Sequence, residues 1–140
     1  MRSMVSVADP RAASQLVRGF HSLESNSWRW TKGNFTVTLR PPLNAGRDGA
    51  WLLLKFSIPE AVLSKVGPVR LTANVNGRPV EGETYSKSGD YTFRREAPAA
   101  AFHGDDPVTI EFALDKFLAA GVVEQRELGI IVSMIGLEAK

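Results

Sequence analysis

Hydrophobic and polar residues alternate over most of the chain, and this period of two is typical of β-strands with one buried face. The clearest alternating stretches are residues 35–39, 51–58, 69–75, 91–95 and 108–114. Asn76-Gly77, directly after the third stretch, is a dipeptide preferred in two-residue β-hairpin turns. The pattern predicts about seven to nine short strands, and therefore an all-β antiparallel β-sandwich for which we expect a jelly-roll topology.

The most apolar run of the sequence, Leu128 to Val132, predicts a central strand because it is rich in β-branched residues. Leu128, Ile130 and Val132 share one face, but Ile135 and Leu137 fall out of phase with them. A β-bulge near Ser133-Met134 would return both sets to the core.

Several segments between the alternating stretches predict turns, loops or short helices. Lys32-Gly33-Asn34 indicates a tight turn or a bulge, and residues 81–90 indicate a polar loop that carries Tyr85. Pro59 at the start of residues 59–66 favours a short helical turn, which Gly67-Pro68 would end.

The N-terminal residues 1–18 are the least regular part of the chain. Pro10, with Asp9 as its N-cap, predicts a short helix that Gly19 would end, and a flexible lead-in is the alternative. Residues 19–140 are then expected to form a single β-sandwich domain, a length that can bury a core without disulfides.

Charge and composition exclude several functional classes. Lys and Arg number 17 against 15 Asp and Glu, and the net charge of +2 is spread along the chain, so we expect no nucleic-acid partner. The chain has no cysteine and only two histidines, which excludes thiolate chemistry and disfavours a metal centre. Without a secretory leader or a long apolar run, we expect a cytoplasmic protein with no membrane partner.

A family resemblance rests on three groups of residues: Trp28-Arg29-Trp30-Thr31 after Gly19-Phe20 and Leu23-Glu24, then Val75-Asn76-Gly77, then Gln125 to Val132 with Ile135. These residues resemble a family of uncharacterised bacterial jelly-roll β-sandwich modules, found alone or beside glycosyltransferases and cell-envelope polysaccharide proteins. The resemblance covers most of the chain from Gly19 onward, and Gln125 stands where similar modules often carry Asp. The resemblance implies a galactose-binding-like jelly-roll sandwich and a carbohydrate-related context, but no mapped binding residues. Physically, Arg126 is expected to pair with Glu124 or Glu127 and to order its loop.

Aromatic side chains are the first candidates for a ligand site, because sugars present an apolar C–H face to rings and hydroxyls to polar groups. Trp51 lies on the less buried face of its predicted strand, and Tyr85 lies in the polar loop. Trp28 is a further candidate, although it and Trp30 are also expected as core residues. The polar partners expected at such a site are Asp90 and Arg94, with Arg29 and Asn74 as further candidates.

Catalytic and metal-binding patterns are weak. Asp105-Asp106 is a candidate for structural Ca²⁺, but a turn before a strand is the simpler interpretation. Glu111 and Asp115 do not establish a glycosidase pair, and neither histidine has a nucleophile motif around it. We expect a protein that is not an enzyme and needs no cofactor.

The sequence therefore favours a non-catalytic module that binds a glycan or glycoconjugate through exposed aromatics and loop polar groups. The alternative is a protein–protein or self-assembly module without a small ligand. In that case exposed apolar residues such as Trp51 and Leu53 would form the interface with a protein partner or a second copy.

Overall fold

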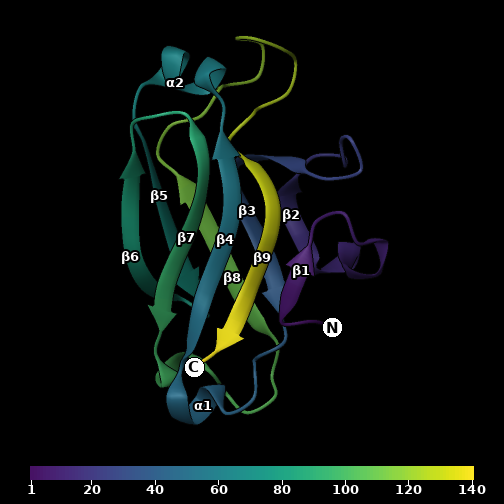
Figure 1. The fold of residues 1–140 in the computed structure, drawn as a ribbon, viewed down its shortest axis with the longest axis vertical. Helices are drawn as coiled ribbons and strands as arrows, with labels where there is room; N and C mark the ends of the chain where they lie inside the picture. The colour runs from purple at the N-terminus through teal and green to yellow at the C-terminus, as the bar shows by residue number, and fades with distance from the viewer.

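The computed structural model describes residues 1–140 and confirms the β-sandwich (Figure 1). The nine strands follow one hydrogen-bonded path, β6-β5-β8-β3-β9-β4-β7, with β1 beside β9 and β2 beside β3. The path folds into two layers, called here the front sheet (β1, β9, β4, β7) and the rear sheet (β2, β3, β8, β5, β6) by their place in Figure 1. All pairings are antiparallel. The strands are β1 Met4–Ser6, β2 Leu16–Phe20, β3 Arg29–Leu39, β4 Ala50–Ile58, β5 Val69–Val75, β6 Arg78–Tyr85, β7 Gly89–Ala97, β8 Val108–Leu114 and β9 Ile131–Ala139. The short helices are η1 Pro10–Gln15, α1 Ala45–Asp48, α2 Glu60–Val66 and η2 Ala99–Ala101.

The alternating stretches are strands whose apolar side chains fill the space between the two sheets, as predicted. In β4 and β8 every second residue is at most 5% exposed. Phe35 and Phe112 stack across β3 and β8 with ring centroids 4.9 Å apart, near the centre of the rear sheet. Asn76 and Gly77 both have positive φ in the turn between β5 and β6, which confirms the predicted hairpin.

The predicted bulge in β9 is also confirmed. Phe56 of β4 pairs with Val132, whereas Lys55, one residue earlier, pairs with Met134, so Ser133 is the extra residue. The bulge therefore keeps Val132, Ile135 and Leu137 together in the core. The strand itself differs from its expected position, because β9 begins at Ile131 and the buried residues 128–130 precede it.

Of the two predictions for Lys32-Gly33-Asn34, the turn is wrong, since β3 runs through these residues. The bulge agrees with the pairing, because Arg18 and Phe20 of β2 are two residues apart whereas their partners Thr36 and Thr31 are five apart. The first residues of β3 pair with β9 of the front sheet, and residues 34–39 pair with β8 of the rear sheet. β3 therefore passes from one sheet to the other. An added Cβ at Gly33 would lie 2.4 Å from the ring of Phe117, so glycine makes room for a neighbour here rather than for a turn.

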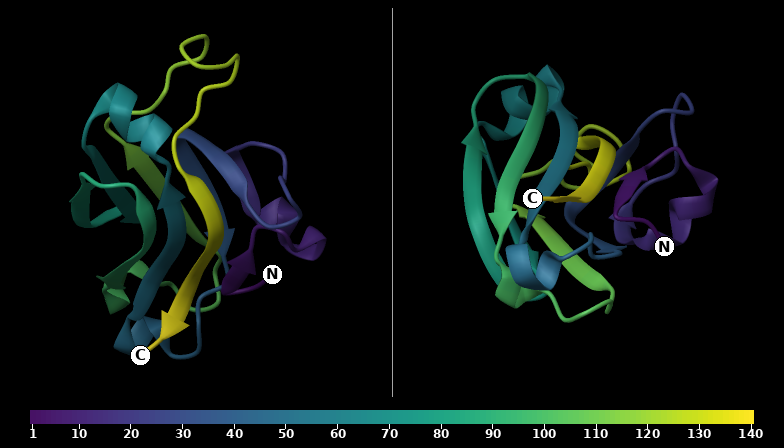
Figure 2. Two further views of the ribbon diagram at one scale, coloured as in Figure 1. Left: turned by 45° about the horizontal axis from the view of Figure 1, so that its top comes forward. Right: turned by 60° about the horizontal axis from the view of Figure 1, so that its bottom comes forward.

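The N-terminal segment packs against the sandwich, beside β3 and β9 (Figure 2). The predicted helix is present as η1, with the Asp9 carboxylate accepting from the backbone N–H of Arg11. It ends at Gln15, whose buried amide bonds the backbone of Arg2 and Thr38. The residue expected to end the helix, Gly19, and the boundary expected after residue 18 both fall inside β2.

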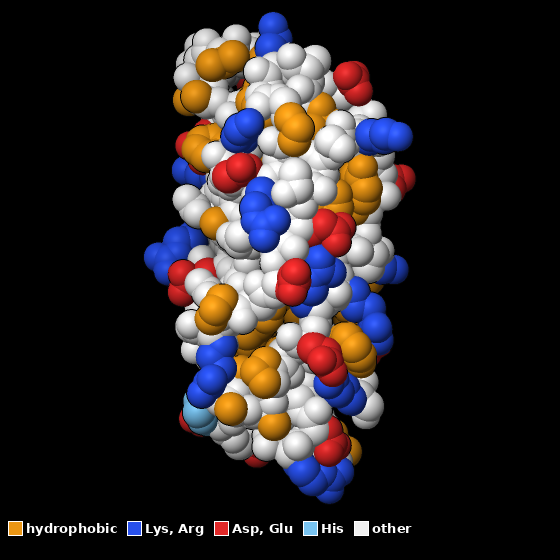
Figure 3. All heavy atoms as spheres, turned by 90° about the vertical axis from the view of Figure 1, so that its left-hand side faces the viewer, with side chains coloured by type: hydrophobic (Ala, Val, Ile, Leu, Met, Phe, Trp, Pro, Cys, Tyr) orange, Lys and Arg blue, Asp and Glu red, His pale blue; other side chains and the backbone are white.

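The loop prediction at residues 81–90 is wrong for most of these residues, which lie in β6 and at the start of β7. These two strands are the edges of opposite sheets and do not pair with each other, and together they close one side of the sandwich. Figure 3 looks onto this side and shows charges of both signs interspersed with small apolar areas. Arg95 of β7 bridges to β6, donating to the Glu81 carbonyl at 2.8 Å and to the Glu83 carboxylate at 2.7 Å. This arginine lowers the pKa of Glu83. No helix of the chain is long and apolar enough to cross a bilayer.

Replacing Arg95 by methionine should lower the free energy of unfolding by about 1–3 kcal/mol, because two hydrogen bonds from a charged donor are lost between β6 and β7. Thermal denaturation measures the loss, and Arg78→Met, an exposed arginine of β6, is the matched control. Part of the difference in unfolding free energy between the unmodified protein and Arg95→Met should vanish in acid. The lowered pKa of Glu83 means that its contribution is present above the unfolded pKa and lost as pH falls through the folded one. Equal effects of both variants would contradict the bridge.

Candidate functional site

The outer face of β4 and β7 carries three of the five residues predicted for a ligand site. Residues that pair directly across two strands lie on the same face of a sheet. The pairs on this outer face are Trp51 with Glu96, Leu53 with Arg94, Lys55 with Thr92, and Ser57 with Asp90. We call this surface the front strip. Trp51 and Ser57 are six residues apart in an extended strand, so the front strip is about 20 Å long.

One end of the front strip is built around the half-buried indole of Trp51. The guanidinium carbon of Arg94 lies 3.8 Å from the ring centroid, and Lys140 Nζ lies 5.0 Å from it. Lys140 is paired with Glu96. The side chain of Arg94 has neither a salt bridge nor a hydrogen-bond partner, so the indole holds a guanidinium whose N–H groups are free to donate.

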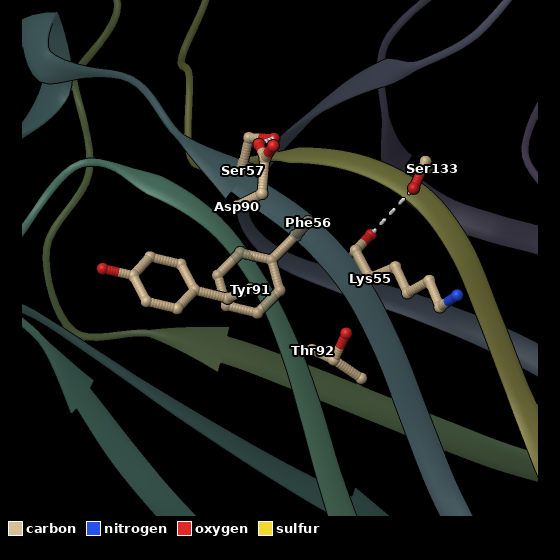
Figure 4. Close-up of a pocket in the computed structure, with 7 residues that line it drawn as sticks. All are labelled: Lys55, Phe56, Ser57, Asp90, Tyr91, Thr92 and Ser133. Carbon is tan, nitrogen blue, oxygen red and sulfur yellow. Dashed lines mark hydrogen bonds between the residues drawn. The ribbon is translucent and has the colours of Figure 1, made fainter.

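The other end of the front strip is a hollow of about 390 Å³ (Figure 4). The Ser57 hydroxyl donates to Asp90 at 2.5 Å, which leaves the second carboxylate oxygen open. Lys55, Thr92 and Ser133 also line the hollow. The β9 bulge places Ser133 in the hollow. The change of phase in the apolar pattern of this strand therefore marks a residue of the site.

A row of paired residues extends this end across four strands. Asp90 pairs with Ser57, Ser57 with Ile131, and Ile131 with Trp30 of β3. Trp30 is half-buried and packs in part against the core. Sequence reasoning gave no prediction of this neighbourhood, because β3 and β7 meet only through the order of strands in the sheet.

Two predicted site residues lie elsewhere. The prediction that Tyr85 is an exposed ring is wrong, because Tyr85 is the last residue of β6 and only 4% exposed. It packs against Phe56 and Tyr91, and burial beside the Glu83 carboxylate raises its pKa. Its hydroxyl lies near Glu83 without a hydrogen bond of normal geometry. Trp28 is half-buried in a bridge with Glu24 before β3, outside the front strip.

The charged residues before β9 order the loops, as the sequence indicated. Arg126 pairs with Glu124 through two nitrogens and lies 3.7 Å from Glu24, and the first pair lowers the pKa of Glu124. The Glu127 carboxylate accepts from the backbone N–H of Gly33, and its carbonyl oxygen lies 2.6 Å from Nε2 of His21. This part of the resemblance motif holds the loop 115–130 against β3.

Asp105 and Asp106 lie in an exposed turn, where the Asp106 N–H donates to the His103 carbonyl. No group of three or more His, Cys, Asp or Glu side chains in the chain is placed to hold a metal ion. The hydrogen bond from the Asp106 N–H agrees with the simpler interpretation of this pair as a turn.

Comparisons with known proteins show the fold. No protein-family model and no curated protein sequence matches the chain. A family 35 carbohydrate-binding module from Clostridium thermocellum superposes with a TM-score of 0.51 at 13% identity, over 97% of this chain and 98% of that module. A carbohydrate-binding module characterised for mannan recognition, TmCBM27, gives 0.52 at 13% identity over 98% and 96%. An exo-β-1,3-galactanase from Phanerochaete chrysosporium with bound galactose gives 0.50 at 14% identity, and the match spans 98% of this chain but 29% of the galactanase. The chain is thus a jelly-roll β-sandwich.

Proposed function

We propose that this chain is a non-catalytic module that binds a neutral glycan along the front strip. The observation that carries the proposal is the common placement of Trp51, Arg94 and Asp90 on one outer face beside a hollow. Only one carboxylate, Asp90, lines that hollow, whereas glycoside hydrolysis ordinarily uses a pair. The geometry supports binding without catalysis.

Trp51 and Arg94 form one stacked unit, because the guanidinium lies over the indole ring. The planar guanidinium and the uncovered part of the indole together offer a rigid surface to a sugar ring, with N–H donors at its edge. Arg94 is already ordered by its contact with the ring, so less conformational entropy is lost when its N–H groups donate to sugar hydroxyls.

The Asp90 end supplies acceptors and donors for a second sugar unit. Asp90 is an acceptor only, Lys55 is a donor only, and the hydroxyls of Ser57, Thr92 and Ser133 can do either. Sugar hydroxyls both donate and accept, so such a mixed lining matches them. The mixture of charges also favours a neutral ligand over a polyanion.

The structural neighbours also support a glycan partner, because two of them are carbohydrate-binding modules. The glycosyltransferase context that the sequence resemblance implies remains an expectation. The expected cytoplasmic location stays a prediction.

Thermal denaturation with mannohexaose, xylohexaose and β-1,3-galactotriose tests the proposal. A saccharide present at ten times its Kd stabilises the folded protein by about 1.4 kcal/mol, which raises Tm by about 3–5 °C. Trp51→Ala and Asp90→Ala should each reduce the affinity at least about tenfold in a calorimetric titration.

Trp28→Ala is the matched control, because Trp28 is also a half-buried tryptophan but lies outside the front strip. It should bind the saccharide as the unmodified protein does. Binding that survives Trp51→Ala and Asp90→Ala, or is lost in Trp28→Ala, would contradict the front strip as the site.

A second candidate function is self-assembly through the same face. An added Cβ at Gly136 would lie 2.1 Å from Sδ of Met4, so Met4 covers Gly136, which pairs with Leu53. Met4, Leu53 and Trp51 thus give the face a half-buried apolar part. Light scattering after gel filtration discriminates the two functions. A dimer that Leu53→Glu dissociates, with no Tm shift for any saccharide, would favour the interface.

A further inference from the structure

The outer face of the rear sheet carries a second hollow, of about 470 Å³. Asn74, a further candidate polar partner from the sequence, lines it, but the sequence did not predict which residues would surround Asn74. Residues of β2, β3, β8, β5 and β6 line the hollow, so it extends across the whole sheet. The main polar residues that line it are Arg18, Asn34, Thr36, Arg70, Asn74 and Glu111.

Strand register explains why these side chains gather. Arg18 pairs with Thr36, Thr36 with Glu111, and Glu111 with Asn74, which sets four polar residues in one row across four strands. In the next row Asn34 pairs with Ala113, whose small side chain leaves room above the sheet.

Most of the polar groups in this row are free. The side chains of Asn34, Asn74 and Glu111 have no protein hydrogen-bond partner, and Arg18 gives only one bond, to Thr36 Oγ1 at 3.3 Å. No carboxylate forms a salt bridge with Arg18 or with Arg70. The hollow therefore offers free amide and carboxylate groups. Its two guanidinium groups make one protein hydrogen bond each, Arg18 to Thr36 and Arg70 to Thr84 Oγ1 at 3.3 Å, and keep their other N–H groups free.

The lining contains no exposed aromatic ring, because Phe112 points into the core. Its charges alternate, with Glu111 on the central strand between Arg18 and Arg70. A phosphate backbone would be repelled by this central carboxylate. A neutral polyhydroxylated ligand suits the alternation, since its hydroxyls donate to Glu111 and accept from the arginines and amides.

We propose that this rear hollow is a second saccharide-binding surface, which holds a neutral sugar by hydrogen bonds alone. The proposal rests on the proposed glycan-binding function and extends it, because the front strip and the rear hollow lie on opposite faces of the sandwich. One chain would then bind two glycan strands at once and link them.

A titration of ¹⁵N-labelled protein with mannohexaose, xylohexaose and β-1,3-galactotriose, followed by amide NMR, tests the rear hollow even for millimolar affinities. A saccharide should shift amides of β3, β8 and β5 around Glu111 with an affinity independent of the front strip. The double variant Glu111→Ala, Asn74→Ala should lower the affinity measured from these shifts at least about tenfold. It should leave the affinity measured from the amides of β4 and β7 unchanged.

Thr109→Ala is the control, because Thr109 lies on the same strand and face as Glu111 but outside the hollow. It should leave both sets of shifts unchanged. Shifts confined to the front strip, and lost only in Trp51→Ala, would overturn the rear hollow while the proposed function stands. Shifts around Glu111 that survive Trp51→Ala would support the rear hollow even if the front strip fails.

Discussion

Replacing Gly19 by alanine should cost about 3 kcal/mol or more and detach β2 from the rear sheet, whereas the same change at Gly77 should cost only about 1–2 kcal/mol. Both glycines have φ of +82°, so the backbone strain of an alanine is the same at the two positions. At Gly19 an added Cβ would also lie 2.1 Å from the Asn34 carbonyl oxygen, whereas nothing lies within 4 Å at Gly77.

The clash at Gly19 is with the backbone of β3 and cannot be relieved by a side-chain rotation. Gly19 lies where the register of β2 on β3 shifts between Arg18 and Phe20, so the strands must separate to make room. Separation would remove the edge-to-face contact of Phe20 with Phe35, whose centroids are 5.5 Å apart. Urea denaturation of both variants measures the difference. Equal losses of stability in the two variants would contradict the close approach of Gly19 to the Asn34 carbonyl oxygen.

Deleting Lys55 should unfold the protein or leave it without fixed tertiary packing, whereas deleting Ser133 should be tolerated. Both residues are exposed on paired strands of the front sheet. Without Lys55, the residues after Leu54 move by one position, and Phe56 and Ile58 turn from the core to the solvent. Losing two such buried side chains costs about 5–10 kcal/mol, which is comparable with the whole stability of a domain.

Without Ser133, Val132 is followed directly by Met134, and the alternation in β9 becomes regular without turning Ile135 or Leu137 outward. The deletion removes the bond from the Val7 N–H to the Ser133 carbonyl, so a loss of about 1–2 kcal/mol is expected. Near-ultraviolet circular dichroism and thermal denaturation of the two deletions provide the measurement. If deleting Ser133 also destroyed the packing, the bulge would not be the simple one-residue insertion described.

The strands and the bulge could be predicted because they depend on local order in the sequence. Alternation identified β4 and β8, and the phase change between Val132 and Ile135 located the extra residue in β9. The same logic placed Trp51 on the outer face. These features need only the geometry of a single strand.

The burial of Tyr85 could not be predicted from its neighbours in the sequence. Glu83, Thr84 and Ser86 around it are polar and exposed, so the segment has the composition of a loop, but the ring is buried against Phe56 and Tyr91 of the opposite sheet. Burial at this position depends on which strands face each other across the sandwich. The sequence contains no local signal for that.

The neighbours of the site residues are also set by strand order. Trp51 and Arg94 are far apart in the sequence, and the contact between them follows from the pairing of β4 with β7. The rear hollow arises in the same way, from the register of four strands. Residue types predicted a glycan site, but only the topology groups them into surfaces.

The central claim, that a glycan lies against Trp51, is tested most directly by ¹⁹F NMR of protein labelled with 5-fluorotryptophan. The chain has three tryptophans, so three resonances are expected, and single Trp→Phe variants assign them. The saccharide among mannohexaose, xylohexaose and β-1,3-galactotriose that raises Tm should shift the Trp51 resonance and leave that of Trp28 in place. A saccharide that stabilises the protein but leaves the Trp51 resonance unmoved would contradict the account.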